Sequence, residues 1–227
     1  MPTAQVNDIE MYYEIHGDGP WLVLIAGLGV DLSIFQQSID ELAKQYKVLV
    51  FDNRGVGKTD KPDVPYSIQM MADDTFSLLA SLGIKRALVL GLSMGGRIAM
   101  ELTLSHPEMT EKLILVSTSS SLQAEISPFV KMIKRVRSLR KSDQPYYAFI
   151  RQLKASSGYD CTGRLKEISA PALIVYGKND KLVTASQIDD MKRNIKNSEL
   201  ASFSGGHLFF LLKSEQFTAR LLEFLSE

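Results

Sequence analysis

Ser93 lies in the sequence Gly-Leu-Ser-Met-Gly (residues 91–95), directly after an apolar run at residues 87–90. A Gly-x-Ser-x-Gly pattern between a strand and a helix places its serine on a tight, strained turn. The apolar run predicts the strand, and residues 94–105 have the apolar spacing of a helix. We therefore expect the Ser93 hydroxyl to stand clear of a sheet as a nucleophile. The alternative is a glycine-rich turn with an unreactive serine.

A serine nucleophile needs a base that removes its proton and a third group that orients the base. The chain has three histidines. His16 precedes an early turn, and His106 precedes a proline where a helix is expected to end, which favours a capping or solvent-facing role. His207 follows two glycines, between the last predicted strand and the last predicted helix. The chain order serine, acid, histidine makes His207 the predicted base.

The acid is expected between Ser93 and His207, at the carboxyl end of a strand. Asp180 fits, because it closely follows the predicted strand at residues 172–176. Asp160 is the competitor, but no strand precedes it, and the pair at residues 189–190 falls on a predicted helix. Asp180 is therefore the predicted acid. The alternative is an aspartate that only forms a turn.

A tetrahedral intermediate on the serine needs two backbone donors for its oxyanion. The Met94 N–H is one candidate, because it begins the helix after Ser93 and gains from the helix dipole. The second should come from the loop after the predicted strand at residues 21–26. Gly27 and Gly29 flank Leu28 there, which favours the Leu28 N–H. The alternative for this loop is a simple turn that ends the strand.

Strand-like and helix-like segments alternate along most of the chain, which indicates a mostly parallel sheet covered on both faces. The alternation stops between residues 119 and 165, where we expect two or three helices, around residues 128–139 and 143–154. This segment is interpreted as a lid on the sheet. The predicted strands are residues 9–15, 21–26, 46–51, 87–90, 113–116, 172–176 and 200–203, and the other predicted helices are residues 33–43, 68–82, 94–105, 185–195 and a last one that ends at residue 225.

Length, composition and charge argue against several other classes of protein. The 227 residues suffice for one α/β domain, and 26 basic residues balance 26 acidic ones, which argues against nucleic-acid binding. No apolar run is long enough to span a bilayer, and the first residues lack the pattern of a secretion signal. Cys161 is the only cysteine, so no internal disulfide is possible. We expect a soluble, cytoplasmic protein.

Two other site types are set aside. The residues Gly57-Lys58-Thr59 suggest a phosphate-binding loop, but Asp52 stands where that motif needs its first glycine. The chain has no cysteine and histidine cluster with the spacing of metal ligands. We therefore expect no metal and no cofactor.

The lid carries an excess of positive charge. Between residues 131 and 154 one acid, Asp143, opposes eight basic residues, giving +7. The simpler interpretation is an amphipathic helix with a solvated outer face. The sharper hypothesis is that the lid steers an anionic substrate or docks an acidic acyl-carrier protein. The basic residues are Lys131, Lys134, Arg135, Arg137, Arg140, Lys141, Arg151 and Lys154.

With these motifs in place, the chain resembles the α/β-hydrolase superfamily in its esterase and lipase-like branch. The turn at residues 52–57, the Ser93 turn, residues 105–108, residues 171–180 and the Gly206-His207 pair carry the resemblance. It implies an eight-stranded, mostly parallel sheet with helices on both faces and a short helical cap after the sixth strand. We expect a core at residues 1–118 and 166–227 and a cap at residues 119–165.

The resemblance also implies Ser93, Asp180 and His207 as a catalytic triad, with Leu28 and Met94 as oxyanion donors. Relatives often have His-Gly where this chain has Ala26-Gly27. The expected activity is hydrolysis of a small carboxylic ester through an acyl-enzyme. Lactones, thioesters and C–C bonds beside a ketone are alternatives within the same chemistry. A ligand-binding protein without turnover, or an interaction module that docks through its basic lid, are the alternatives outside it.

Overall fold

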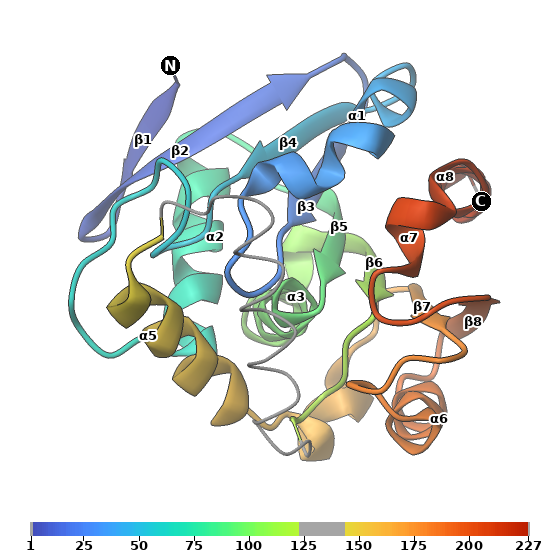
Figure 1. Cartoon of the computed structure of the whole chain (residues 1–227). Helices are drawn as coiled ribbons and strands as arrows, with labels where there is room; N and C mark the ends of the chain where they lie inside the picture. The colour runs from blue at the N-terminus through green and yellow to red at the C-terminus, as the bar shows by residue number, and fades with distance from the viewer. Residues whose placement is uncertain (1, 123–143, 227) are drawn as a thin grey trace.

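The computed structural model describes residues 2–122 and 144–226, and the helix expected around residues 128–139 lies outside them. Its centre is one sheet of eight strands in the order β1-β2-β4-β3-β5-β6-β7-β8 (Figure 1). β2 pairs antiparallel with β1 and β4, and all other neighbours are parallel. The strands are β1 (Thr3–Val6), β2 (Ile9–His16), β3 (Trp21–Ile25), β4 (Lys47–Phe51), β5 (Ala87–Leu92), β6 (Thr110–Val116), β7 (Ala172–Gly177) and β8 (Ser198–Phe203).

Helices cover both faces of the sheet, as predicted. Alternate residues of a strand point to opposite faces, so Val23 and Ile25 of β3 join one hydrophobic core and Leu22 and Leu24 join the other. The first core also contains residues of α2, α3, α5 and α6, and the second contains residues of α1 and α8. The helices are α1 (Gln36–Leu42), α2 (Ile68–Ser81), α3 (Met94–Ser105), α5 (Tyr146–Ser157), α6 (Ala185–Asn194), α7 (Phe209–Leu212) and α8 (Ser214–Ser226), with single 3₁₀ turns at Leu32–Phe35, Pro107–Met109 and Thr162–Glu167.

The parallel strands place the candidate residues at one edge. β3, β5 and β7 run in the same direction, so the loops that follow them leave from the same end of the sheet. Leu28 follows β3, Ser93 follows β5 and Asp180 follows β7. In parallel α/β sheets this carboxyl edge is where ligands bind.

The structure differs from the sequence prediction at β1 and at the start of α5. β1 was not predicted, because its four residues are too short for a clear alternation; it forms by pairing with β2 across a two-residue turn at Asn7 and Asp8. The helix expected at residues 143–154 is α5, which begins only at Tyr146. Pro145 restricts the residue before it to extended backbone, so the helix starts after the proline.

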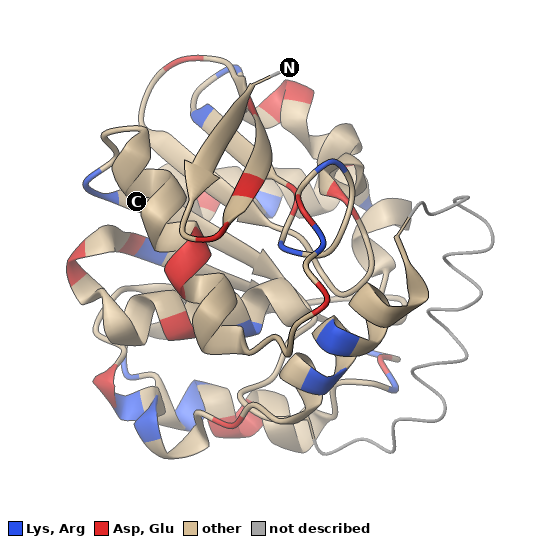
Figure 2. Cartoon of the chain, turned by 90° about the vertical axis from the view of Figure 1, so that its left-hand side faces the viewer, with Lys and Arg blue, Asp and Glu red and all other residues tan. Residues whose placement is uncertain are grey.

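Basic and acidic residues are interspersed along the ribbon on the side shown in Figure 2. Of the eight basic lid residues, Arg151 and Lys154 fall on α5, and the six from Lys131 to Lys141 lie outside the described residues. Arg151 pairs with Asp63 of the core at 3.0 Å. Within the described part of the chain, no helix has the length and apolar character that crossing a membrane requires.

Candidate active site

Ser93 occupies a strained turn between β5 and α3. Its φ of 54° and ψ of −113° lie in a region that non-glycine residues rarely adopt. The Ser93 N–H donates to the Val116 carbonyl at 2.8 Å, and the Thr118 hydroxyl donates to the Ser93 carbonyl at 2.7 Å. These two bonds to the end of β6 and the loop after it hold the turn in place.

The flanking glycines are required by close packing of the backbone. A Cβ at Gly91 would lie 2.3 Å from the Gly95 carbonyl oxygen, and a Cβ at Gly95 would lie 2.1 Å from the Ile25 carbonyl oxygen. Both distances are far below contact, so α3 reaches β3 and β5 this closely only because side chains are absent. The glycines of the motif therefore position α3, and with it the Met94 N–H.

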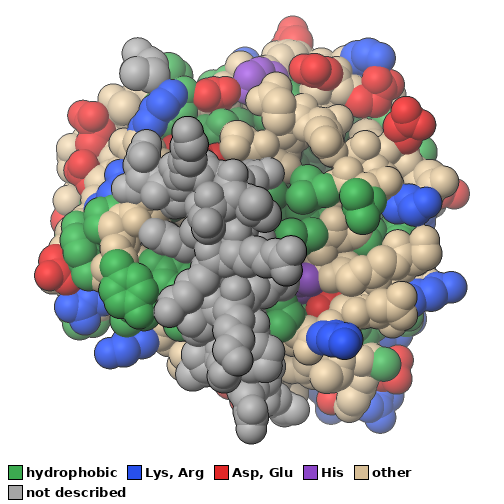
Figure 3. Space-filling model, viewed as in Figure 1, with side chains coloured by type: hydrophobic (Ala, Val, Ile, Leu, Met, Phe, Trp, Pro, Cys, Tyr) green, Lys and Arg blue, Asp and Glu red, His purple; other side chains and the backbone are tan. Residues whose placement is uncertain are grey.

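His207 lies beside the Ser93 hydroxyl. Its Nε2 is 3.0 Å from Ser93 Oγ, and the residue is buried. The Ser117 hydroxyl donates to the His207 carbonyl at 2.9 Å, which holds the loop after β8 against the loop after β6. The same loop approaches β7 closely, since a Cβ at Gly177 would lie 2.4 Å from the Gly206 carbonyl oxygen. In the space-filling view, hydrophobic side chains gather next to a histidine on this face (Figure 3).

Asp180 completes a chain of hydrogen bonds. Its Oδ2 lies 2.8 Å from His207 Nδ1, and its side chain is 1% exposed. The other oxygen, Oδ1, accepts the N–H groups of Leu182 and Val183 at 2.8 and 3.2 Å. Because Oδ1 is occupied in this way, Oδ2 is directed at the imidazole. A proton on Nδ1 then leaves Nε2 free to accept the proton of Ser93.

The loop after β3 lies against Ser93 on the other side. A Cβ at Gly27 would be 3.5 Å from Ser93 Cβ, which shows how close the loop passes. Within the described residues, neither the Leu28 N–H nor the Met94 N–H donates a hydrogen bond to the protein. Two backbone donors beside a nucleophile are what a developing oxyanion needs.

Two buried side chains next to β4 support this loop from the core. Asn53 donates its side-chain N–H to the Ala26 carbonyl at 2.9 Å, and Asp52 accepts the Leu32 N–H at 2.8 Å. Burial raises the pKa of the Asp52 carboxyl, while its bonds from the Lys58 and Leu32 N–H groups act in the opposite direction. Sequence reasoning missed these supporting roles: it used residues 52–57 for the family resemblance and Asp52 to reject a phosphate-binding loop.

The other candidates for the base and the acid make contacts away from Ser93. His16 contacts Glu14 at 3.1 Å on β2, and His106 stacks on Phe76 with ring centroids 3.8 Å apart. Asp160 accepts the Thr162 N–H at 2.8 Å as part of a turn. The structure therefore brings Ser93, His207 and Asp180 together and leaves the competitors out. In the described part of the chain, no group of three or more cysteine, histidine or acidic residues is placed to hold a metal ion.

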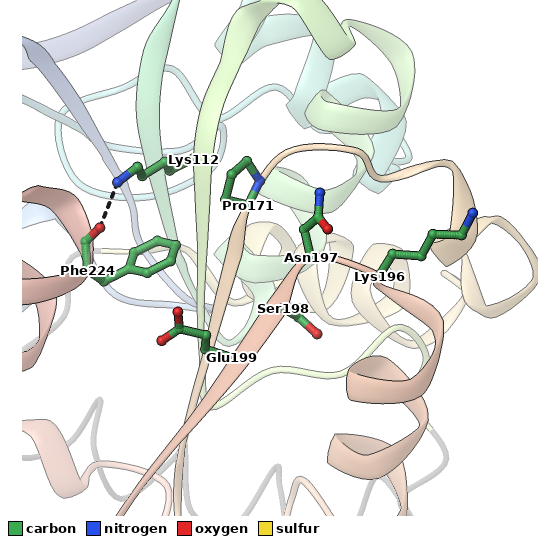
Figure 4. Close-up of a pocket in the computed structure, with 7 residues that line it drawn as sticks. All are labelled: Lys112, Pro171, Lys196, Asn197, Ser198, Glu199 and Phe224. Atoms are coloured by element: carbon green, nitrogen blue, oxygen red, sulfur yellow. Dashed lines mark hydrogen bonds between the residues drawn. The ribbon is translucent and has the colours of Figure 1, made fainter. Parts of the chain in front are cut away.

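A separate hollow of about 390 Å³ lies near the amino ends of β6 and β8 (Figure 4). Its lining includes Lys112, Pro171 and Glu199. The Lys112 ammonium donates to the Phe224 carbonyl at 2.8 Å and so caps α8. This hollow is at the sheet edge opposite Ser93, and Lys112 has a structural role there.

The sequence and structure of this chain were compared with those of known proteins, and both have similar counterparts. Residues 20–156 match the family described as alpha/beta hydrolase fold. A protein of Serratia proteamaculans named "Putative carbamate hydrolase RutD" is 30% identical over 95% of this chain and 96% of its own length. The enol-lactonase from Burkholderia xenovorans LB400 has a similar structure, with a TM-score of 0.90, 24% identity and coverage of 100% of both chains. The esterase EaEST from Exiguobacterium antarcticum gives a TM-score of 0.91 at 24% identity, covering 99% of both chains.

Proposed function

This chain belongs to the α/β-hydrolase family, and from that premise we propose that it hydrolyses carboxylic esters through an acyl-enzyme on Ser93. The observation that carries the proposal is the continuous hydrogen-bond chain from Ser93 Oγ through the His207 imidazole to Asp180. A serine hydroxyl gains nucleophilicity when a base is in reach and a carboxylate orients that base. The strained backbone at Ser93 adds support, because such strain is concentrated at functional sites.

In the first half of the reaction, Ser93 Oγ attacks the ester carbonyl carbon while His207 Nε2 takes its proton. The carbonyl oxygen becomes an oxyanion that accepts hydrogen bonds from the Leu28 and Met94 N–H groups. The intermediate then collapses: the C–O bond to the alcohol breaks, and His207 gives its proton to the departing oxygen. The alcohol leaves, and the acyl group stays bound to Ser93.

In the second half, a water molecule attacks the acyl carbon and His207 takes one of its protons. The second tetrahedral intermediate collapses by breaking the bond to Ser93 Oγ, which recovers the proton from His207. Asp180 stays ionised throughout and stabilises the imidazolium that forms in each half. The products are one carboxylic acid and one alcohol, and the enzyme returns to its starting state.

A carbamate ester is the second candidate substrate. The 30% identity over almost the whole chain to the relative named "Putative carbamate hydrolase RutD" supports this candidate. Its carbonyl carbon presents the same target to Ser93 as an ester does. Lactones, thioesters and C–C bonds beside a ketone stay open as predictions, since fold alone does not select among them. Non-catalytic ligand binding is the alternative outside this chemistry.

The test is hydrolysis of p-nitrophenyl esters from acetate to long acyl chains, alongside a lactone and an aryl carbamate. The variants are Ser93→Ala and, as a matched control, Ser81→Ala, whose hydroxyl bonds only within α2. We expect the wild type to turn over at least one of these substrates. Ser93→Ala should lower this turnover by about a million-fold if the triad acts as a unit, and Ser81→Ala should leave it unchanged. Turnover retained in Ser93→Ala, or none in the wild type on any of these substrates, would contradict the proposal.

A finer proposal is that the basic lid steers an anionic substrate to the site or docks an acidic acyl-carrier protein, in the cytoplasm. Its support is the +7 charge between residues 131 and 154. Steering of this kind weakens as salt rises. We expect the ratio of kcat/KM for a carboxylate-bearing ester over a neutral ester to fall at high salt. An unchanged ratio would remove the support for steering.

A further inference from the structure

Gln152 connects helix α5 to the loop that carries Leu28. It is fully buried at 0% exposure, and both ends of its side-chain amide are used. Its Oε1 accepts the Gly29 N–H and the side-chain N–H of Gln144, each at 3.0 Å. Its Nε2 donates to the Arg54 carbonyl at 2.8 Å. Gln152 therefore bonds at once to the loop after β3 and to the turn after β4.

The Gly29 contact matters because of where its peptide lies. The Leu28 N–H belongs to the peptide between Gly27 and Leu28. The preceding peptide is held by Asn53 through the Ala26 carbonyl, and the following peptide is held by Gln152 through the Gly29 N–H. With both neighbouring peptides fixed, only small rotations are left to the one between them. The direction of the Leu28 N–H is thus set from the core on one side and from α5 on the other.

A glutamine suits this position chemically. The Gly29 N–H can only donate and the Arg54 carbonyl can only accept, so the side chain that joins them needs one acceptor and one donor. Ala26 has no polar side-chain atom that could hold the loop instead. Phe149 packs on the same segment, because a Cβ at Gly29 would lie 3.2 Å from Phe149 Cδ2. Gly29 also has a φ of 70°, a left-handed conformation that glycine adopts readily and other residues rarely do.

We propose that Gln152 is a positioning residue that aims the Leu28 N–H at the oxyanion. This rests on the proposed function, in which Leu28 is an oxyanion donor. An intact oxyanion donor stabilises the transition state more than it stabilises bound substrate, so misdirecting that donor lowers kcat more than it raises KM. Removing a whole oxyanion donor costs about 10²- to 10³-fold in kcat. A misdirected donor should cost part of that, roughly 10- to 100-fold.

The experiment compares Gln152→Met, Gln152→Glu and Tyr147→Phe with the wild type. Methionine has a similar volume and cannot make either bond, whereas glutamate keeps the oxygen that accepts the Gly29 N–H. Tyr147→Phe is the matched control, since it removes another bond from α5 to a core carbonyl, Tyr147 Oη to Lys61 at 2.7 Å, without touching the loop. Each kcat is normalised to active sites titrated with a fluorophosphonate, so partial misfolding does not count as lost catalysis.

We expect Gln152→Met to lower kcat about 10- to 100-fold with KM within about three-fold, and Gln152→Glu to recover part of that loss. A trifluoromethyl ketone, which forms a tetrahedral oxyanion on the serine, should lose affinity for Gln152→Met in parallel with kcat. Tyr147→Phe should match the wild type in both measurements. If Gln152→Met also matches it, or if its ketone affinity is unchanged, the positioning role is wrong while the proposed function stands. Absence of Ser93-dependent turnover in the wild type itself would overturn both.

Discussion

The two sides of the candidate site are held by different parts of the chain. On the acid–base side, the bonds that fix Ser93, His207 and Asp180 come from residues of the predicted core, such as Val116 and Ser117. On the oxyanion side, the Leu28 loop is held by Asn53 from the core but also by Gln152 from α5. The proposed triad is therefore held by the sheet and its loops, whereas the proposed oxyanion hole also depends on α5, a helix of the predicted cap.

Two buried arginines repeat this contrast. Arg54 is buried, which opposes its charge, but bonds to Asp74 and Asp8 outweigh burial and raise the pKa of its guanidinium. Burial lowers the pKa of Arg97 to about 10, so it stays charged at neutral pH. Among the described residues, Arg97 donates hydrogen bonds to neutral oxygens of Ser119 and of Ser156 on α5. The buried cation Arg54 is therefore paired with carboxylates, whereas the described partners of Arg97, next to α5, are neutral.

The largest effect within this comparison is expected from Asp180→Asn. Asparagine keeps an oxygen for the Leu182 and Val183 N–H groups but directs an N–H at His207 Nδ1. The imidazole then holds its proton on Nε2 and cannot accept the Ser93 proton. We expect kcat/KM to fall about 10⁴-fold with little loss of fold, measured by ester hydrolysis and circular dichroism. A decrease of less than ten-fold would mean that Asp180 does not orient the base.

A smaller effect is expected from Gly29→Ala, with Gly83→Ala as its control. Both glycines have a φ of 70°, but a Cβ at Gly83 meets nothing within 4 Å. Each variant should lose roughly 1–2 kcal/mol of unfolding free energy from backbone strain. Only Gly29→Ala should also lower kcat, about ten-fold or more, because its Cβ presses on Phe149 beside the oxyanion loop. Equal kcat values in the two variants would show that the loop tolerates displacement.

Ser156→Ala should affect stability but not turnover. It removes the 2.6 Å bond from Arg97 and leaves a buried guanidinium N–H without that acceptor. We expect a loss of about 1–3 kcal/mol in unfolding free energy, with kcat changed by less than about two-fold because the loop contacts remain. Ser157→Ala, whose hydroxyl bonds only within α5, is the control. A large fall in kcat for Ser156→Ala would place Arg97 in the chemistry.

The smallest effect is expected from alkylation of Cys161, just beyond α5. Burial raises the pKa of its thiol to about 11, so only about one molecule in a thousand carries the thiolate at pH 8. Iodoacetamide at pH 8 should leave the mass and activity of the native protein unchanged, and labelling should quicken as the pH approaches 11. The unfolded protein should gain one label at pH 8. Rapid labelling of the native protein would indicate that the packing of Cys161 against Met100 of α3 opens.

The positions of Ser93, Asp180 and His207 could be predicted from the sequence. Most of the contacts that hold the Leu28 loop could not. Ser93 has a local motif, and chain order with strand ends selected Asp180 and His207, whose hydrogen bonds in the structure match that selection. Gln152 lies 123 residues from Gly29 in the chain, and no local pattern marks a helical glutamine as a partner of a distant loop. Contacts of this kind follow from packing, which periodicity does not specify.

Whether Ser93 is a nucleophile activated by His207 is tested most directly by covalent labelling. The intact protein is treated with an alkyl fluorophosphonate and examined by mass spectrometry. The reagent reacts with a serine whose proton a neighbouring base removes. We expect one adduct per chain on the peptide containing Ser93, none in Ser93→Ala, and much slower labelling in His207→Gln. No adduct in the wild type, or an adduct on another residue, would contradict this expectation.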